Sequence, residues 1–225
     1  MDAKDLGLIG TKVGMTQVFD DEGNVVPVTA ILVAENVVTE IKKADEKDGY
    51  NAVQIGNFET KEKHITKPLR VSLEKKELKL YKKLQEFRTH ETPDLNIGDE
   101  ISTEDFFKDL EKVDLTSFSI GKGFQGGVKA HNMHIGRRSH GSKSHRQIGS
   151  LGAGTYPGRV FKGKRMPKRL GNKKVTTTKV KVFAFDPETR VLLVKGPVSG
   201  KKGTEVTIKA SGVKAWNEYN KKQAA

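Results

Sequence analysis

The sequence contains no cysteine, which excludes disulfide bonds, thiolate metal ligands and cysteine nucleophiles. It also has no run of about 18 apolar residues, the minimum that a membrane-spanning helix needs. Residues Met1–Asp5 lack the basic and then apolar pattern of a secretory signal. We therefore expect neither a disulfide-rich secreted protein nor a membrane protein.

Acidic residues are absent from one long stretch. No Asp or Glu occurs between Gly121 and Lys174, although the chain has 28 of them. The same stretch holds fourteen of the 41 Lys and Arg residues and carries a charge of +14. Because the whole chain has a net charge of +13, the rest of it sums to −1. A surplus of one sign costs self-repulsion, so this stretch indicates a polyanionic partner such as nucleic acid.

Periodically spaced apolar residues are also missing between Gly121 and Lys174, so neither a helix nor a strand is predicted there. The stretch contains twelve of the 23 glycines and four of the six histidines. A Gly-rich chain loses much backbone entropy when it becomes ordered, and little apolar area is present to offset that loss. We predict a long extension that becomes ordered against phosphates, which can approach its backbone N–H groups closely at the glycines.

Short segments rich in Val and Ile on both sides of this stretch predict strands. They are Leu6–Ile9, Val13–Phe19, Val25–Val33, Val37–Lys42, Ala52–Phe58, Val175–Phe185, Val191–Lys195 and Glu205–Lys209. Turn residues predict hairpin loops at Asp20–Asn24 and Asp186–Thr189. Many short strands at this spacing favour an antiparallel barrel or sandwich. We expect a mainly β chain: an antiparallel β-barrel with a long basic, Gly-rich loop extension and a few short helices.

Two helices are predicted between the strands. Apolar residues at helical spacing indicate one at Leu73–Phe87, and Ser102 resembles the N-cap of a second at Thr103–Val113. We therefore expect a body formed by residues 1–120 and 175–216, with a helical insertion at about 73–113. The extension would comprise residues 121–174, and residues 217–225 would form a C-terminal tail.

Two motifs in the extension resemble a nucleotide site and a metal site, but each lacks residues or surroundings that such a site needs. Gly121–Gly126 matches the G-x-G-x-x-G fingerprint of dinucleotide sites, but no carboxylate follows about twenty residues later to hold a ribose. His131, His134, His140 and His145 resemble a metal cluster, but the cations around them would repel a metal ion. With no carboxylate nearby to orient these histidines, general acid–base catalysis is also disfavoured. We expect no catalytic residue, metal, cofactor or small-molecule substrate.

The cations are spread along the extension, as expected of phosphate contacts along a polynucleotide. Besides the residues named below, we expect Lys129, Arg137, Arg138, Lys143, Lys168 and Arg169 to bind RNA, together with His131. Phe124, Tyr156 and Phe161 are interleaved with them and could stack on unpaired bases, which favours folded RNA over duplex DNA. For Phe124 and Phe161, packing at the root of the loop is an equal alternative. The rival functions are an RNA-modifying or RNA-cleaving enzyme and a DNA-compacting protein.

Five segments, in order along nearly the whole chain, resemble the bacterial type of the large-subunit ribosomal protein L3 family. They are Gly7–Phe19, Gly121–Gly126, Ser139–Arg146, Pro157–Met166 and Leu192–Gly200. The resemblance implies a structural, non-enzymatic component of the large subunit that binds its rRNA early in assembly, near the rRNA 3′ end. It also implies neighbouring ribosomal proteins as partners, an extension that reaches toward the peptidyl transferase centre and an influence on how tRNA and factors are accommodated.

Matching residues of the family would make rRNA contacts at Lys122, His140, Ser142, His145, Arg146, Arg159, Lys162, Lys164 and Arg165. The stretch 149–158 would be the tip of the extension, with Gly149, Ser150, Gly152, Ala153 and Gly154.

Three positions depart from the pattern of the family. Many bacterial members have a glutamine, which can be methylated, where this chain has Ala153, so we do not predict that modification. Lys168 and Asn172 stand where relatives often have glycine, and of the two only Asn readily adopts left-handed backbone.

The tip and Pro93–Asp99 resemble cyanobacterial and plastid members, so we expect a ribosome in the plastid (chloroplast) stroma, with the bacterial cytoplasm as the alternative.

Overall fold

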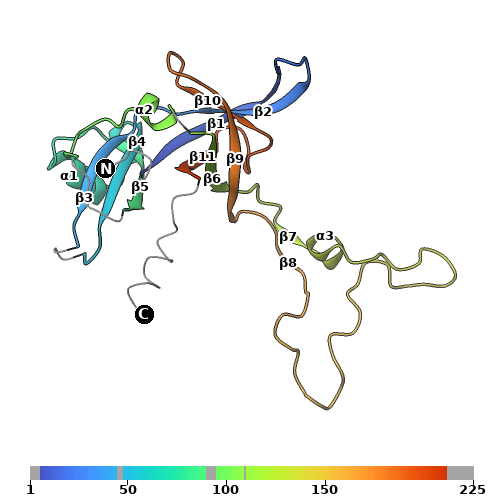
Figure 1. Ribbon diagram of the computed structural model, residues 1–225. Helices are drawn as coiled ribbons and strands as arrows, with labels where there is room; N and C mark the ends of the chain where they lie inside the picture. The colour runs from blue at the N-terminus through green and yellow to red at the C-terminus, as the bar shows by residue number, and fades with distance from the viewer. Residues whose placement is uncertain (1–5, 45–47, 90–94, 109, 212–225) are drawn as a thin grey trace, which may run out of the picture. The chain divides into compact units, whose positions relative to one another are not determined.

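The structure is a computed structural model that describes residues 6–44, 48–89, 95–108 and 110–211 (Figure 1). The chain forms two compact units, Met1–Phe118 with Lys174–Ala225, and Ser119–Lys173. We call the first unit the body and the second the extension. The predicted C-terminal tail, residues 217–225, lies outside the described residues. None of the helices formed by the described residues is long and apolar enough to cross a membrane.

Six antiparallel strands of the body pair in an order that closes on itself. The order is β1 (Gly7–Phe19), β11 (Glu205–Ala210), β6 (Lys112–Phe118), β9 (Lys174–Asp186), β10 (Val191–Lys195) and β2 (Val25–Leu32), and β2 pairs again with β1, forming a closed barrel. Leu8, Ile31, Leu115, Leu192 and Ile208 come from five of these strands and are almost completely buried in one core cluster. The prediction of a mainly β chain is confirmed.

A second sheet packs against the same core. It consists of β3 (Val37–Lys42), β4 (Ala52–Glu59) and β5 (Tyr81–Arg88), and Val53, Ile55 and Phe87 join the core cluster. Two fully buried amides also connect it to the barrel. Asn36 accepts a hydrogen bond from the Ile9 N–H at 2.9 Å, and the Asn57 amide donates to the Ile9 carbonyl at 3.1 Å. These bonds satisfy buried backbone groups of β1 that would otherwise destabilise the body.

The predicted helix at Leu73–Phe87 is wrong. A 3-10 turn at Glu62–His64 and helix α1 (Lys67–Glu74) come earlier, and Glu77, with φ 55°, lies in left-handed backbone after α1. The chain then forms β5, which pairs with β4 along nearly its whole length. Tyr81 and Phe87 are six residues apart, so they lie on one face of a strand, and both are buried. Pairing and burial of that face outweigh the helical preference of the intervening Lys, Leu, Gln and Glu.

The second predicted helix is correct only at its start. Helix α2 spans Thr103–Phe107, and the Ser102 hydroxyl accepts a hydrogen bond from the Asp105 N–H at 3.3 Å, as the capping pattern predicts. Val113 belongs to β6, a strand that the sequence does not predict. The helical insertion expected at about 73–113 therefore contains two strands of the body.

Other boundaries differ less. Leu6–Ile9 and Val13–Phe19 form one strand, β1, with an irregularity between Lys12 and Gly14 where it pairs with β2. The hairpin loops at Asp20–Asn24 and Asp186–Thr189 are confirmed, because strands end and begin on either side of each. In the first loop, the Asp20 carboxylate accepts a hydrogen bond from the Asn24 N–H at 2.7 Å.

Gly7 of the barrel lies close to the Phe87 ring of the second sheet. A methyl group built on Gly7 would overlap the buried ring of Phe87, whereas one built on Gly14 of the same strand would meet nothing within 4 Å. We expect Gly7→Ala to lower the free energy of unfolding by about 1–3 kcal/mol, because the packed ring cannot move freely. Gly14→Ala is the matched control and should change it little. Urea unfolding of both variants measures this, and equal stabilities would contradict the packing described.

Candidate nucleic-acid interface

The root of the extension is a short antiparallel pair of chain segments. Strand β7 (Phe124–Gln125) pairs with β8 (Lys168–Arg169), and the Lys122 N–H donates to the Leu170 carbonyl at 2.8 Å. Gly171 passes so close to the Ile120 carbonyl that no side chain would fit. Asn172 adopts left-handed backbone with φ 49°, as expected of Asn in place of glycine, whereas Lys168 lies in a strand and needs no such conformation. The root is therefore held by backbone contacts.

A small cluster follows the root. Helix α3 (Gly127–His131) begins at Gly127, where an added methyl group would collide with the sulfur of Met133. The structure describes every residue of the extension, and only Gly127 among them is buried. The His131 Nε2 lies 2.9 Å from the Met166 carbonyl, so this nitrogen donates the hydrogen bond. The extension has no hydrophobic core comparable to that of the body.

Two loops leave this cluster and diverge (Figure 1). The first, residues 136–145, is closed by two hydrogen bonds: the Gly136 N–H donates to the His145 carbonyl, and His145 Nδ1 donates to the Arg137 carbonyl, both at 2.9 Å. His140 and Gly141, with φ of 58° and 75°, turn the chain at the end of this loop. A side chain at Gly136 would collide with the Ser144 carbonyl. The backbone fold of this loop depends on glycine and on His145.

The second loop contains the predicted tip. Gly149, Ser150, Gly152, Ala153 and Gly154 are all exposed, and the Ser150 hydroxyl donates to the Gly152 carbonyl at 2.9 Å. Farther along, the Arg159 guanidinium lies 5.3 Å from the centre of the Phe161 ring, within the range of a cation–π contact. This loop presents backbone, cations and aromatic rings to solvent.

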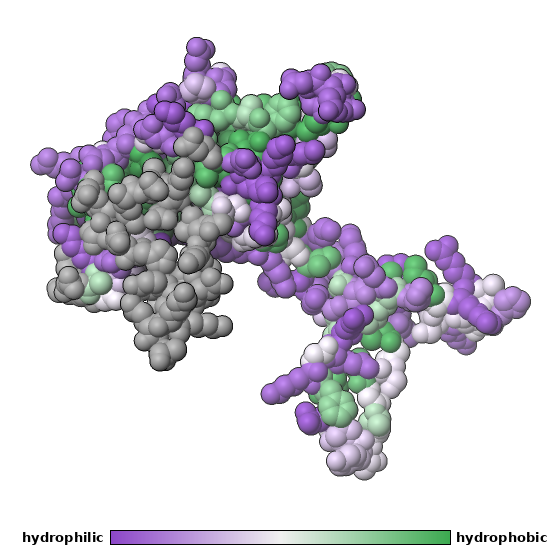
Figure 2. All heavy atoms as spheres, viewed as in Figure 1, coloured by the Kyte–Doolittle hydropathy of each residue, from purple (hydrophilic) through white to green (hydrophobic). Residues whose placement is uncertain are grey.

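The electrostatics of the two units differ. All thirteen Lys and Arg residues of the extension are exposed, as is Lys174 beside it in the sequence, and none of the fourteen forms an ion pair with any described residue. Hydrophilic side chains project from both loops of the extension (Figure 2). The body, by contrast, contains ion pairs, for example Lys42 with Glu86 at 2.9 Å and Lys83 with Glu205 at 2.8 Å. The positive charge of the extension has no compensation within the described chain.

The predicted contact residues are distributed over the extension and do not converge on one pocket. All of them are exposed except His131 and Ser142, which are partly buried. Phe124 and Phe161 are 72% and 58% exposed, so the alternative that they pack at the root is wrong. Exposed apolar residues that the sequence does not single out are Phe118 and Ile120, next to the root in sequence. Their position just before the stretch without acidic residues is the only signal in the sequence that could have found them.

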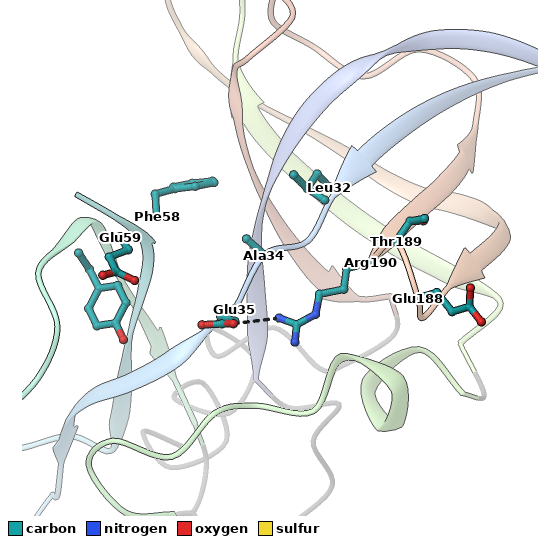
Figure 3. Close-up of a pocket in the computed structure, with 9 residues that line it drawn as sticks. Leu32, Ala34, Glu35, Phe58, Glu59, Glu188, Thr189 and Arg190 are labelled. Atoms are coloured by element: carbon teal, nitrogen blue, oxygen red, sulfur yellow. Dashed lines mark ion pairs between the residues drawn. The ribbon is translucent and has the colours of Figure 1, made fainter. Parts of the chain in front are cut away.

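One pocket in the body is large enough for a small molecule, but its side chains do not form a recognisable catalytic or metal site. It has a volume of about 310 Å³ and is lined by Leu32, Ala34, Glu35, Phe58, Glu59, Tyr81, Glu188, Thr189 and Arg190 (Figure 3). Arg190 lies 3.7 Å from Glu35 and 3.2 Å from Glu100, and Glu59 pairs with Lys79 at 3.2 Å. Two of its three carboxylates, those of Glu35 and Glu59, are therefore held in ion pairs. Among the described residues, no three His, Asp or Glu side chains gather where they could hold a metal ion.

Comparison with known proteins identifies the family. The family model for ribosomal protein L3 matches residues 89–191. A protein of Alkaliphilus metalliredigens named large ribosomal subunit protein uL3 is 49% identical over 201 residues, which cover 89% of this chain and 95% of that protein. The chain belongs to the ribosomal protein L3 family. It is therefore a structural constituent of the large ribosomal subunit and not an enzyme, which confirms both predictions and overturns the RNA-modifying alternative.

Relatives within the L3 family come from bacteria and from chloroplasts. The uL3 protein of Prochlorococcus marinus strain MIT 9215 is 46% identical, and the match covers 92% of this chain and 95% of that protein. The uL3c protein of Spinacia oleracea is 45% identical, over 88% of this chain and 65% of that protein. The two kinds of relative match with similar identity, so a place in the large subunit is established for the chain, and the plastid location stays a prediction.

The closed loop 136–145 gives a test of the local geometry. We expect Gly136→Ala to displace the Ser144 carbonyl and break the hydrogen bond from residue 136 to His145, which would raise the amide hydrogen-exchange rate of residue 136. Gly154→Ala is the control, because a methyl group there would meet nothing within 4 Å and the backbone is not left-handed. Unchanged exchange in the Gly136 variant would mean that the loop is not closed as described.

Proposed function

We propose that the chain binds large-subunit rRNA directly and that the extension is its main RNA-binding element. The observation that carries this proposal is the set of thirteen exposed cations of the extension, without a single ion pair among the described residues. Such an array is destabilised by its own repulsion in isolation and is stabilised by phosphates. Binding to rRNA would therefore compensate the charge that the protein leaves uncompensated.

Each kind of residue in the extension has a matching role in this proposal. Exposed Lys and Arg would neutralise phosphates, and the exposed rings of Phe124, Tyr156 and Phe161 would stack on unpaired bases. His145 donates from Nδ1 to the Arg137 carbonyl, which leaves Nε2 as an acceptor for a 2′-OH group. Glycines at the turns let backbone N–H groups approach the RNA.

The lack of a core in the extension supports early assembly. Only one residue of the extension is buried, so most of the free energy that orders it must come from its partner. Two diverging loops of this kind are accommodated most easily while the RNA around them is still open. We therefore propose that the chain joins the large subunit early, next to neighbouring ribosomal proteins, and that the extension reaches toward the peptidyl transferase centre. The resemblance of the tip to plastid members supports a chloroplast ribosome.

Charge neutralisation predicts how binding depends on salt. Replacing Arg159, Lys162 and Lys164 with Gln should reduce the slope of log affinity against log salt by about two to three, because each phosphate contact contributes about 0.7–0.9. Replacing the exposed body residues Lys61, Lys63 and Lys67 removes the same charge and should leave the slope nearly unchanged. Filter binding to a bacterial large-subunit rRNA transcript between about 50 and 200 mM salt measures both. Equal slopes for the two variants would refute the assignment to the extension.

Deleting residues 129–168 tests the role of the extension in the subunit. The described core lies entirely in the body, so we expect the truncated chain to fold, with near-native thermal unfolding, but to be absent from large subunits. Sedimentation of tagged full-length and truncated chains with ribosomes compares them. If the truncated chain enters subunits normally, the extension is not the main anchor.

Competition with duplex DNA at matched salt tests the DNA-compacting alternative, which equal affinity for DNA and rRNA would favour.

A further inference from the structure

A band of threonines crosses three neighbouring strands on the outer face of the barrel. In the strand register, Thr207 of β11 lies opposite Thr116 of β6, which lies opposite Thr176 of β9. The Thr116 and Thr176 hydroxyls are 2.9 Å apart, so one donates to the other and the pair still offers a free hydroxyl hydrogen and free acceptor positions. These threonines therefore offer hydroxyl groups that can hydrogen-bond to a ligand.

Beside this band is a recess of about 190 Å³ in the body. It is lined by Ile9, Lys83, Gln85, Thr116, Ser117, Phe118, Lys174, Glu205 and Thr207. Pockets that enclose small molecules usually measure about 300–1,000 Å³, so this recess is too small for a typical metabolite. It is large enough to receive part of a polymer that passes over the surface.

The charge around the recess is positive. Glu205 is already paired with Lys83 at 2.8 Å, whereas Lys174 forms no ion pair with any described residue. Burial and, to a smaller extent, the charge of Lys174 lower the pKa of the Lys209 ammonium group. An anion bound at Lys174 would relieve this repulsion.

An exposed aromatic ring borders the same recess. Phe118, at the end of β6, lies directly opposite Lys174 of β9 in the register, and its side chain is 53% exposed. Cross-strand neighbours have Cβ atoms about 4.5–5.5 Å apart, so the ring and the ammonium group can contact the same ligand. An aromatic face next to a cation and hydroxyl groups matches one nucleotide, with its base, phosphate and 2′-OH.

We propose that this recess is a second RNA contact of the chain, on the body, and that it binds one unpaired nucleotide of large-subunit rRNA. The base stacks on Phe118, the phosphate lies at Lys174, and the hydroxyls of Thr116 and Thr207 bond the sugar or the base edge. The inference rests on the proposed rRNA binding and adds a contact outside the extension. A protein partner fits less well, because lysines are depleted in the cores of protein interfaces.

Variants of Phe118 in the full chain test the stacking contact. Stacking on an aromatic ring is sequence-tolerant and strong, so Phe118→Leu should weaken binding to a bacterial large-subunit rRNA transcript about tenfold. Phe118→Tyr keeps a ring and should bind like the unsubstituted chain. Phe19→Leu is the matched control, because Phe19 is 63% exposed at the end of β1 and does not line the recess. Lys174→Gln should reduce the salt slope by about 0.7–0.9, whereas Phe118→Leu should leave it unchanged.

Photocrosslinking gives a readout that does not depend on any substitution. With a transcript that contains 4-thiouridine, we expect a crosslinked peptide that includes Phe118. If the unsubstituted chain does not bind the transcript, both the proposed function and this inference fail. If it binds, but Phe118→Leu behaves like Phe19→Leu and no crosslink forms at Phe118, only this inference is overturned. Loss of subunit incorporation with unchanged rRNA affinity in Phe118→Leu would also overturn it, in favour of a protein partner.

Discussion

The positive charge of the extension, which no described residue compensates, determines how little the extension can gain by folding on itself. Its cations are all exposed and unpaired among the described residues, and almost no apolar surface is buried beside them. A chain of this composition gains little by folding on itself, because ordering costs entropy and brings like charges together. The first loop is instead shaped by short-range backbone constraints at Gly136, and the root by those at Gly171.

The body supplies what the extension lacks. Its strands close into a barrel whose core continues into the second sheet, and Asn36 and Asn57 connect the two through bonds to Ile9. The extension departs from the end of β6 and returns at the start of β9, which are themselves paired at Phe118 and Lys174. Both ends of a long chain segment are thus fixed by one antiparallel pair. This lowers the entropy that the segment loses on binding, because its ends are already close together.

The charge map and most strand positions could be predicted from the sequence, because they depend on composition and on local alternation. The region from Leu73 to Val113 could not. Its Lys, Leu, Glu and Gln residues favour a helix locally, and only the pairing of β5 with β4 and of β6 with β9 and β11 makes them strands. In the extension the sequence predicts which residues are exposed, but not that His145 closes one loop or that His131 bonds the Met166 carbonyl. Such contacts join residues whose spacing follows no period.

At the positions that depart from the family, the backbone conformation likewise depends in one case on the residue itself and in another on its strand partner. Asn172 takes the left-handed conformation that its residue type permits, which local chemistry predicts. Lys168 needs no glycine-like backbone because it pairs with Gln125, and only the fold reveals that. Phe118 is a similar case. In the sequence it is one apolar residue among many at strand ends, and only the register places it beside Lys174, on the face that also carries Thr116. A functional role for such a residue follows from which side chains the barrel brings together, and the spacing of residues along the chain does not contain that information.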